Sequence, residues 1–427
     1  MISPFFQVLE NRGFRRLWLA QITSQIALNM LTFVLTIQIY EHTKSTIAVS
    51  LMLLSYGIPA IIFGVLAGSV VDLFDKRKIL IFCNISRVFV FILFFFFYKN
   101  LPGIYLLVIS ISILTQLFIP AEGPSIPGLV KSKQLLSANS LFTISFYIST
   151  VVGFIVAGPM LRVFGDRFIF IFMAFMMALA TYFVMQLPKL TSSPVYGTRF
   201  NLLKLLNVTI DGLKFIANQP RVRQALLLMT FSQALISTLA VLAPGFADKV
   251  LSIDLADASY LVMGPAALGL VIGAFFVGRY GGKILKGTYI LTGILACGVI
   301  LILLSITTNS NVIHVPIQSA FGTILDRNIL IAFILLVLLG VSNSMVSVPA
   351  NTILLEDSET ELRGRVYGVL STLTGGVSLL PVIFSGVIAD IAGVSVTILI
   401  LGVAVLSIGI YQFWVRNRTL MNGSPHP

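Results

Sequence analysis

The sequence predicts an all-α membrane protein with twelve transmembrane helices in two six-helix bundles. Of the 427 residues, 57% are hydrophobic and only 10% are charged, and the mean hydropathy is +1.00. Apolar runs of about 20 residues recur along the chain, which is the helical length that crosses a hydrocarbon core of roughly 30 Å. A soluble protein of this size could not bury so much apolar surface, and the alternating pattern of a membrane β-barrel is absent from the sequence.

Twelve apolar runs are long enough to be spans. The first follows Arg12, Arg15 and Arg16, is too long for a signal-peptide core and lacks a convincing cleavage site, so we expect it to be retained. The predicted spans cover residues 17–40, 46–71, 79–98, 104–121, 140–161, 168–187, 224–247, 259–278, 288–307, 328–350, 366–391 and 395–415.

Lysine and arginine residues predict the orientation of these spans. With an even number of spans both termini lie on one side, and 21 of the 28 basic residues belong to that side. The opposite side has six, and Arg87 lies within a span. Because basic residues accumulate on the cytoplasmic side of membrane proteins, we expect both termini in the cytoplasm. The net charge of +12 is explained without a nucleic-acid partner.

The pattern of spans also predicts the domains. It stops after six spans, and the following stretch contains the turn-prone sequence TSSPVYG and six basic residues. We expect an N-terminal bundle at residues 1–188, a cytoplasmic linker at 189–223 and a C-terminal bundle at 224–427.

The two halves share features at corresponding places. Gly68 opens a charged gap after the second span, and Gly278 opens a basic gap after the eighth. The pairs Pro120-Ala121 and Pro349-Ala350 end the fourth and tenth spans. We interpret the halves as a parallel repeat of one six-helix unit.

Polar side chains recur at the first and fourth spans of each half. In the first span they stand three or four residues apart, from Gln21 to Thr36, and therefore share one side of a helix. Because amides that face lipid are unfavourable, we expect these residues to line a central substrate cavity. The alternative is that they hydrogen-bond neighbouring helices. The expected cavity residues are Gln21, Gln25, Asn29, Thr32, Gln116, Gln233, Ser237 and Asn343.

Several other kinds of site are excluded by the sequence. Cys83 and Cys297 fall in spans of different halves, so a disulfide framework is not expected, and no Cys or His set has metal-ligand spacing. The three histidines lie outside the spans, which removes the usual buried proton relay or catalytic triad. The GGK at 281–283 lacks the flanking residues of a phosphate loop. We expect no metal, no cofactor, no direct use of ATP and no enzymatic activity.

The stretch GSVVDLFDKRK at 68–78 resembles a signature of the major facilitator superfamily, found between helices 2 and 3. Gly68 and Asp72 match it, Lys76 and Arg77 occupy its basic pair, and the chain departs from it at two other positions. Further stretches are similar to the branch containing macrolide-efflux and enterobactin-exporter-like permeases: NRGFRRLWLAQITSQ, NISR at 84–87, IPAEGPSIPGLVKSKQLLSANSL at 119–141 and ELRGRVYGVL at 361–370.

The resemblance implies a conformational latch that closes the cytoplasmic side of the transporter. Asp72 ends a helix and Arg363 and Arg365 begin another, so each charge has the unfavourable sign for the helix dipole beside it, and a contact between them would relieve both. Anchoring on lipid headgroups is the alternative for the neighbouring bases. The expected latch residues are Gly68, Asp72, Lys76, Arg77, Arg363 and Arg365.

Two further charges lie in or beside the spans. Arg87 is eight residues into the third predicted span, roughly 12 Å along a helix, and the resemblance favours a scaffold role for it. Glu122 follows Pro120-Ala121 at the end of the fourth span. It is either a solvated helix end or a carboxylate that couples transport to protons. Gly153 and Gly158-Pro159 are expected to be packing and kink residues.

Together these features predict a secondary transporter, monomeric, in the bacterial plasma (inner) membrane. A cavity of amides, hydroxyls and apolar surface suits a moderately hydrophobic molecule such as a drug or siderophore-like compound, and the resemblance implies export. Glu122 is the remaining titratable group near a cavity helix, so protons are the coupling ion that we hypothesise. Three alternatives remain: a lipid or lysolipid translocator, an uptake permease, and a non-transporting membrane receptor or scaffold.

Overall fold

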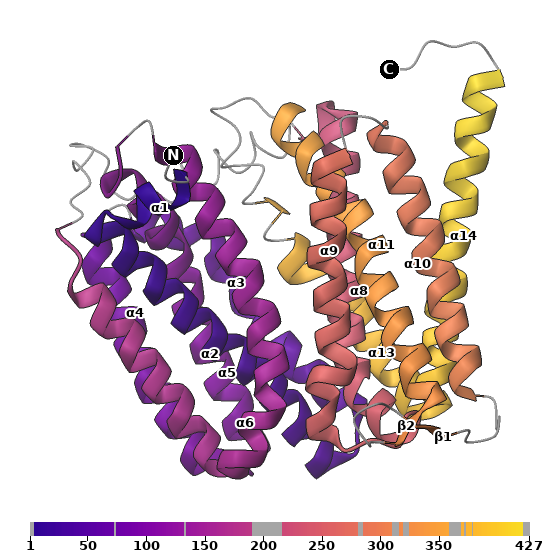
Figure 1. Ribbon diagram of the computed structural model, residues 1–427, viewed down its shortest axis with the longest axis horizontal. Coiled ribbons are helices and arrows are strands. Elements are labelled where there is room, and N and C mark those ends of the chain that lie inside the picture. The colour runs from indigo at the N-terminus through magenta and orange to yellow at the C-terminus, as the bar shows by residue number, and fades with distance from the viewer. Residues whose placement is uncertain are drawn as a thin grey trace. The chain divides into compact units, whose positions relative to one another are not determined.

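The computed structural model describes residues 4–71, 74–131, 134–189, 216–280, 285–309, 316–318, 324–357, 369–370, 373–377 and 379–421. The α-helices, labelled in Figure 1, are α1 (Pro4–Leu9), α2 (Arg12–Thr43), α3 (Thr46–Val71), α4 (Lys76–Phe97), α5 (Leu101–Glu122), α6 (Leu135–Met185), α8 (Pro220–Lys249), α9 (Gly264–Tyr280), α10 (Lys286–Asn309), α11 (Arg327–Asp357), α13 (Leu379–Ala392) and α14 (Val394–Met421). The shorter elements are the 3₁₀ helices η1 (Gly123–Gly128) and η3 (Leu255–Asp257), the π-helices η4 (Ser259–Met263) and η5 (Leu373–Val377), and the antiparallel strands β1 (Pro316–Gln318) and β2 (Ile324–Asp326).

Eleven helical stretches among the described residues are long and apolar enough to cross a membrane, which confirms the predicted fold class. One of them belongs to α6, which at 51 residues is about twice the length that a single crossing needs. Its Gly165 has φ 69° and ψ 173°, a conformation that glycine adopts at little cost. Gly165 lies between the predicted spans 140–161 and 168–187, so a sharp bend joins two of the twelve spans.

Several helices begin before their apolar runs because a polar residue caps them. The side chain of Asn11 accepts hydrogen bonds from the N–H groups of Gly13 and Phe14, and α2 starts at residue 12. The side chain of Asp75 accepts one from the Arg77 N–H at 2.9 Å, and α4 starts at residue 76. Such caps satisfy backbone donors that a helix leaves free at its first turn.

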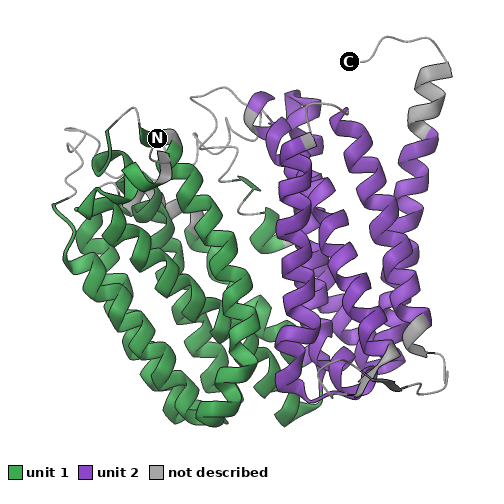
Figure 2. Cartoon of the chain, in the orientation of Figure 1, with its two compact units in different colours: residues 1–44, 48–215, 364–379 green, residues 45–47, 216–363, 380–427 purple. Residues whose placement is uncertain are grey.

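The chain forms two compact units (Figure 2). Unit 1 takes in residues 1–44, 48–215 and 364–379, and unit 2 takes in residues 45–47, 216–363 and 380–427. The principal change of unit, between residues 215 and 216, falls within the segment 189–223.

Unit 1 is built around the long helix α6. Helix α2 packs along α6, and α4 packs against both α5 and α6. A Cβ added at Gly153 would lie 2.7 Å from the Cβ of Asn29, so glycine allows α2 and α6 to approach closely. The rings of Phe94 and Phe170 stack at 5.4 Å between centroids, joining α4 to the second part of α6.

Two arginines bind the end of α6 within unit 1. Arg77, at the start of α4, donates a hydrogen bond to the carbonyl oxygen of Met185, and Arg16 of α2 donates one to that of Gln186 at 2.6 Å. The last carbonyl groups of a helix have no partner within it and carry partial negative charge. The two guanidinium groups therefore stabilise this helix end and tie α2 and α4 to it.

Unit 2 relies on close glycine contacts between its helices. At Gly269 of α9 an added Cβ would lie 2.1 Å from the carbonyl oxygen of Val337, and at Gly340 of α11 it would lie 2.2 Å from that of Ala266. Helix α10 packs against α11 and α14, and α8 packs against α11. Small residues at such crossings permit the backbone contacts that drive helix association in membranes.

Each unit also takes in a short segment from the opposite half of the sequence. Ser45 and the first two residues of α3, Thr46 and Ile47, belong to unit 2, where they contact Asp390 of α13. Residues 364–379 belong to unit 1, where an added Cβ on Gly57 of α3 would lie 2.5 Å from the carbonyl oxygen of Gly375.

Candidate functional site

The polar side of α2 has two kinds of residue. Gln21, 3% exposed, donates from Nε2 to the carbonyl oxygen of Phe142 at 3.2 Å. Asn29 donates from Nδ2 to the hydroxyl of Thr150 at 3.4 Å. Both partners belong to α6, so these two amides join helices within unit 1. Gln25 is half-buried, and its side chain makes no hydrogen bond within the described residues.

The hydroxyl residues of this helix are satisfied locally. Thr32 donates to the carbonyl oxygen of Leu28 at 3.0 Å, and Thr36 donates to that of Thr32 at 2.7 Å. A hydroxyl bonded to the preceding turn keeps its lone pairs for another group. Thr32 is half-buried, so of these two it has the more accessible side chain.

Helix α5 of unit 1 presents both a bonded and a less constrained polar group. Ser112 of α5 donates to the carbonyl oxygen of Tyr56 in α3 at 2.5 Å. Gln116, one turn later, is 9% exposed and has no side-chain hydrogen bond in the part of the chain that the structure describes. Gln116 is therefore the α5 amide with hydrogen-bonding capacity left for a ligand or water.

In unit 2 the expected cavity residues differ in exposure. Gln233, thirteen residues after the start of α8, is exposed, and Ser237 is half-buried. Asn343 of α11 is 3% exposed, and neither atom of its amide has a partner among the described residues. Buried amides are almost always hydrogen-bonded, so Asn343 has unused capacity for water or a bound molecule.

The expected latch falls largely outside the described residues. Asp72, Arg363 and Arg365 are not among them, and Gly68 lies in α3. Lys76 opens α4, and Arg77 binds the end of α6. The structure thus gives Arg77 a partner within unit 1, while the latch itself remains a prediction.

Arg87 lies inside unit 1 and is 1% exposed. Its Nη2 donates to Thr115 Oγ1 at 2.9 Å, and its Nη1 lies 3.4 Å from Asn84 Oδ1. Its guanidinium carbon is 4.5 Å from the centre of the Phe118 ring, a distance at which a cation is attracted to the ring face. Glu122, the last residue of α5, is half-buried and interacts electrostatically with Arg87. No nitrogen of Arg87 pairs with that carboxylate within 4.0 Å.

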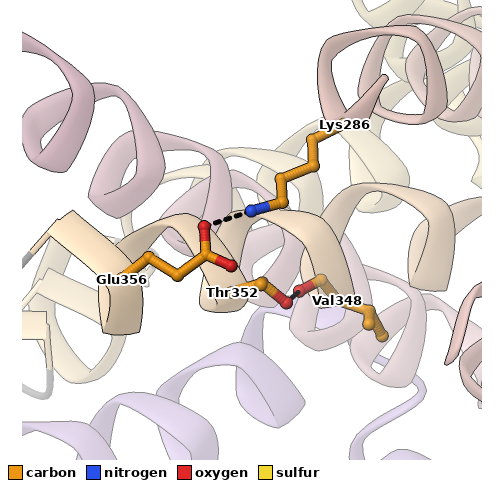
Figure 3. A network of polar contacts seen from close by, with 4 residues as sticks. All are labelled: Lys286, Val348, Thr352 and Glu356. Carbon is orange, nitrogen blue, oxygen red and sulfur yellow. Dashed lines mark hydrogen bonds and ion pairs between the residues drawn. The ribbon is translucent and has the colours of Figure 1, made fainter. Parts of the chain in front are cut away.

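Sequence reasoning missed an ion pair in unit 2. Lys286 at the start of α10 pairs with Glu356 in the last turn of α11, and Figure 3 shows the pair with the Thr352 hydroxyl that donates to the Val348 carbonyl. Each charge has the unfavourable sign for its own helix end, so the pairing relieves both. The signal that could have found it is the one used for the latch, a base opening one helix and an acid closing another.

No group of three or more His, Cys, Asp or Glu side chains that could hold a metal ion occurs in the described ranges. The polar groups that a bound molecule could contact are amides, hydroxyls and the cluster formed by Arg87, Asn84 and Thr115. These residues can bind and orient a molecule through hydrogen bonds.

Comparison with known sequences identifies relatives over most of the chain. A model of the Major Facilitator Superfamily matches residues 17–380. The chain is 24% identical over 415 residues to the uncharacterised MFS-type transporter YfiS of Bacillus subtilis (strain 168), a match covering 96% of this chain and 94% of that protein.

Solved structures share the fold at low identity. A bacterial homologue of the human lysosomal transporter Spinster, in an inward-facing and occupied conformation, matches with a TM-score of 0.74 and 13% identity over 100% of both chains. A mutant of the nucleoside transporter NupG matches with a TM-score of 0.72 and 14% identity, over 94% of this chain and 99% of that one. The likeness concerns the fold, and the substrates in those names belong to those proteins.

Proposed function

The chain belongs to the Major Facilitator Superfamily and is a membrane transporter of that type, and on this basis we propose that it exports a moderately hydrophobic small molecule by alternating access. Export is supported by the resemblance of residues 68–78 and 361–370 to macrolide-efflux and enterobactin-exporter-like permeases. In this proposal the chain forms two bundles, residues 1–188 and 224–427, and the substrate site is accessible alternately from either side of the membrane.

The observation that carries the proposal is the exposure of Gln233. This amide lies near the middle of a 30-residue apolar helix, and its side chain has no hydrogen-bond partner in the described part of the chain. In hydrocarbon, such an amide would lose the hydrogen bonds that it makes with water. A polar group at this depth is therefore expected to face water or a substrate.

Unit 1 supplies further polar groups of this kind. Gln25 and Gln116 keep unused amide capacity, and Thr32 has a partly accessible hydroxyl. The same helices also carry aliphatic and aromatic side chains, such as Ile26, Phe33 and Leu117. Ligand sites commonly combine apolar walls with a few orienting polar groups. A moderately hydrophobic substrate with several hydrogen-bonding groups fits this composition.

We also propose the setting of transport. Both termini lie in the cytoplasm and the protein works as a monomer in a bacterial plasma (inner) membrane, supported by the distribution of basic residues and by the Bacillus relative. The proton gradient drives export, with Glu122 as the coupling carboxylate. The contact of Asp72 with Arg363 and Arg365 closes the cytoplasmic side.

Transport in purified vesicles tests the proposal. Proteoliposomes are loaded with members of a compound panel, and exchange is compared for the parent, Gln233→Leu and Gln224→Leu. Gln224 is also an exposed amide of α8, but nine residues away it lies on the opposite side of the helix. We expect exchange in the parent and in Gln224→Leu, with altered substrate range in Gln233→Leu.

Three results would contradict the proposal. Exchange of none of the compounds would argue for a receptor or scaffold. Competition by lysolipids alone would make the substrate a lipid. In a separate assay on whole cells, uphill movement only into the cells would make the protein an uptake permease.

A further inference from the structure

Arg87 is a buried positive charge that has no carboxylate directly beside it among the residues that the structure describes. It is 1% exposed, and its contacts are the Thr115 hydroxyl, the Asn84 amide oxygen and the Phe118 ring. Each of these groups is neutral. A buried guanidinium that lacks a counter-charge is strongly unfavourable, so a negative group is expected to reach this place.

Two hydrogen-bond donors beside that charge are unused. Arg87 Nε and Asn84 Nδ2 are both buried, and neither has an acceptor within the described residues. Asn84 is 0% exposed, and its amide oxygen lies 3.4 Å from Arg87 Nη1, so both donors belong to one cluster. A carboxylate has two oxygens that accept hydrogen bonds, and it could satisfy both donors while neutralising the charge.

The arrangement of α5 identifies the carboxylate. Thr115, Phe118 and Glu122 follow one another at intervals of three and four residues, so they share one side of the helix. The first two contact Arg87, and Glu122 interacts with it electrostatically.

Within the described ranges, few other charged or titratable groups surround Arg87. Those that interact with it are Cys83 from α4, Tyr56 from α3 and Glu122 from α5. Glu122 is the carboxylate in this set. It ends α5, and an added Cβ on the following residue, Gly123, would have nothing within 4 Å. The backbone directly after Glu122 is therefore not closely packed at Gly123.

We infer that Arg87 and Asn84 form a carboxylate-binding site inside unit 1, which the side chain of Glu122 occupies when it is ionised and leaves when it is protonated. This inference rests on the proposed coupling role of Glu122 and adds Arg87 and Asn84 to it as positioning residues. In the structure the carboxylate lies outside the site. Protonation removes the charge that attracts Glu122 to Arg87, so occupancy of the site follows the protonation of one residue.

Double-mutant cycles test the inference in the purified full-length protein. Melting temperatures are measured for Asn84→Ala, Glu122→Leu and the double variant, and for the corresponding set with Arg87→Gln. Asn84 is neutral, so its coupling to Glu122 cannot arise from long-range attraction between charges and shows that both belong to one contact network with Arg87, whereas coupling of Arg87 could arise at longer range. We expect the double variants to melt several degrees above the value that the two single losses predict.

Controls separate the site from general effects. Arg167 lies over the Phe95 ring at 4.1 Å and is exposed, and Arg167→Gln should combine additively with Glu122→Leu. If Arg87→Gln does not fold, Arg87→Lys replaces it, because lysine keeps the charge and removes the Nε donor. The cycle of Asn84→Ala with Glu122→Leu does not depend on either Arg87 variant. At acidic pH, where Glu122 is protonated, the coupling should fall.

Additive losses in the Asn84 cycle at neutral pH would overturn the inference. Because melting temperatures involve no transport, such a result leaves proton coupling through Glu122 intact. Conversely, a transport assay could show that Glu122 does not couple transport to protons. A non-additive change in melting temperature for Asn84 and Glu122 would still support the site.

Discussion

The carboxylate of Asp390 accepts a hydrogen bond from the backbone N–H of Thr46 at 2.7 Å, at the first residue of α3. It also accepts from the N–H of Ile47 at 3.1 Å and from the hydroxyl of Ser45 at 2.5 Å. The first N–H groups of a helix lack partners within it, and negative charge is favourable beside them. Asp390 therefore caps α3 although the two residues are 344 positions apart in the sequence.

Loss of this cap is expected to destabilise the protein. Asp390→Ala removes the acceptor of all three bonds and should cost about 0.5–2 kcal/mol, the usual range for a cap. Ser45→Ala removes one donor and should cost less. Thermal unfolding of both purified variants checks this order, and equal melting temperatures for the two would contradict it.

Gly269 and Gly278, both in α9, should respond differently to the same substitution. A Cβ at Gly269 would lie 2.1 Å from the Val337 carbonyl oxygen, whereas one at Gly278 has nothing within 4 Å. Gly269→Ala should cost about 1–3 kcal/mol, as overpacking does. Gly278→Ala should be neutral or slightly stabilising, because alanine favours the helix. Melting temperatures measure both, and similar losses would show that α9 and α11 do not cross closely.

The polar side of α2 should divide into stability and transport residues. Gln21→Leu and Asn29→Leu each remove a bond to α6 and should cost roughly 0.6 kcal/mol, typical of such bonds in membranes. Gln25→Leu removes no such bond and should leave the melting temperature unchanged while altering the substrate range. A purified panel assayed for melting and exchange separates the two outcomes. A lower melting temperature for Gln25→Leu, together with an unchanged substrate range, would contradict this division.

The sequence was sufficient to predict the helices because apolar length is a local property. It also predicted that the polar side chains of α2 share one side of the helix, because they are spaced three or four residues apart. It could not predict that Gln21 and Asn29 face α6 while Gln25 does not bond there. That distinction depends on where α6 crosses α2, near Gly153 and Asn29, and the crossing is a tertiary contact.

Helix ends were harder to predict than helix centres. The charged gap before α4 contains Asp75, which departs from the family signature, and the structure shows it as the cap of α4. Asp75 stands shortly before an apolar run, and an aspartate in that place is a common helix cap, so the sequence could have indicated this role. By contrast, no local pattern connects Asp390 with α3 or Arg77 with the end of α6, because each partner lies far away in the sequence.

Asp72 tests the proposed latch. Asp72→Asn removes the charge that would pair with Arg363 and Arg365, so it should shift the protein away from the outward-facing state by about 1–2 kcal/mol. Labelling of single cysteines on the periplasmic side, compared between parent and variant, reports the shift. Unchanged labelling together with unchanged transport would remove the latch.

Glu122 tests the driving force, since it interacts with buried Arg87 at the end of α5. In reconstituted vesicles with an imposed pH gradient, we expect the parent to move substrate uphill and Glu122→Gln to allow only downhill equilibration, because the amide cannot exchange a proton. Glu356→Gln is the matched control: that carboxylate is exposed, lies in the last turn of α11 and pairs with Lys286 in unit 2, so its loss should leave uphill movement intact. Uphill movement of substrate by the Glu122→Gln variant would show that Glu122 is not needed for proton coupling. A parent that ignores the pH gradient would leave another ion or facilitated diffusion as the driver.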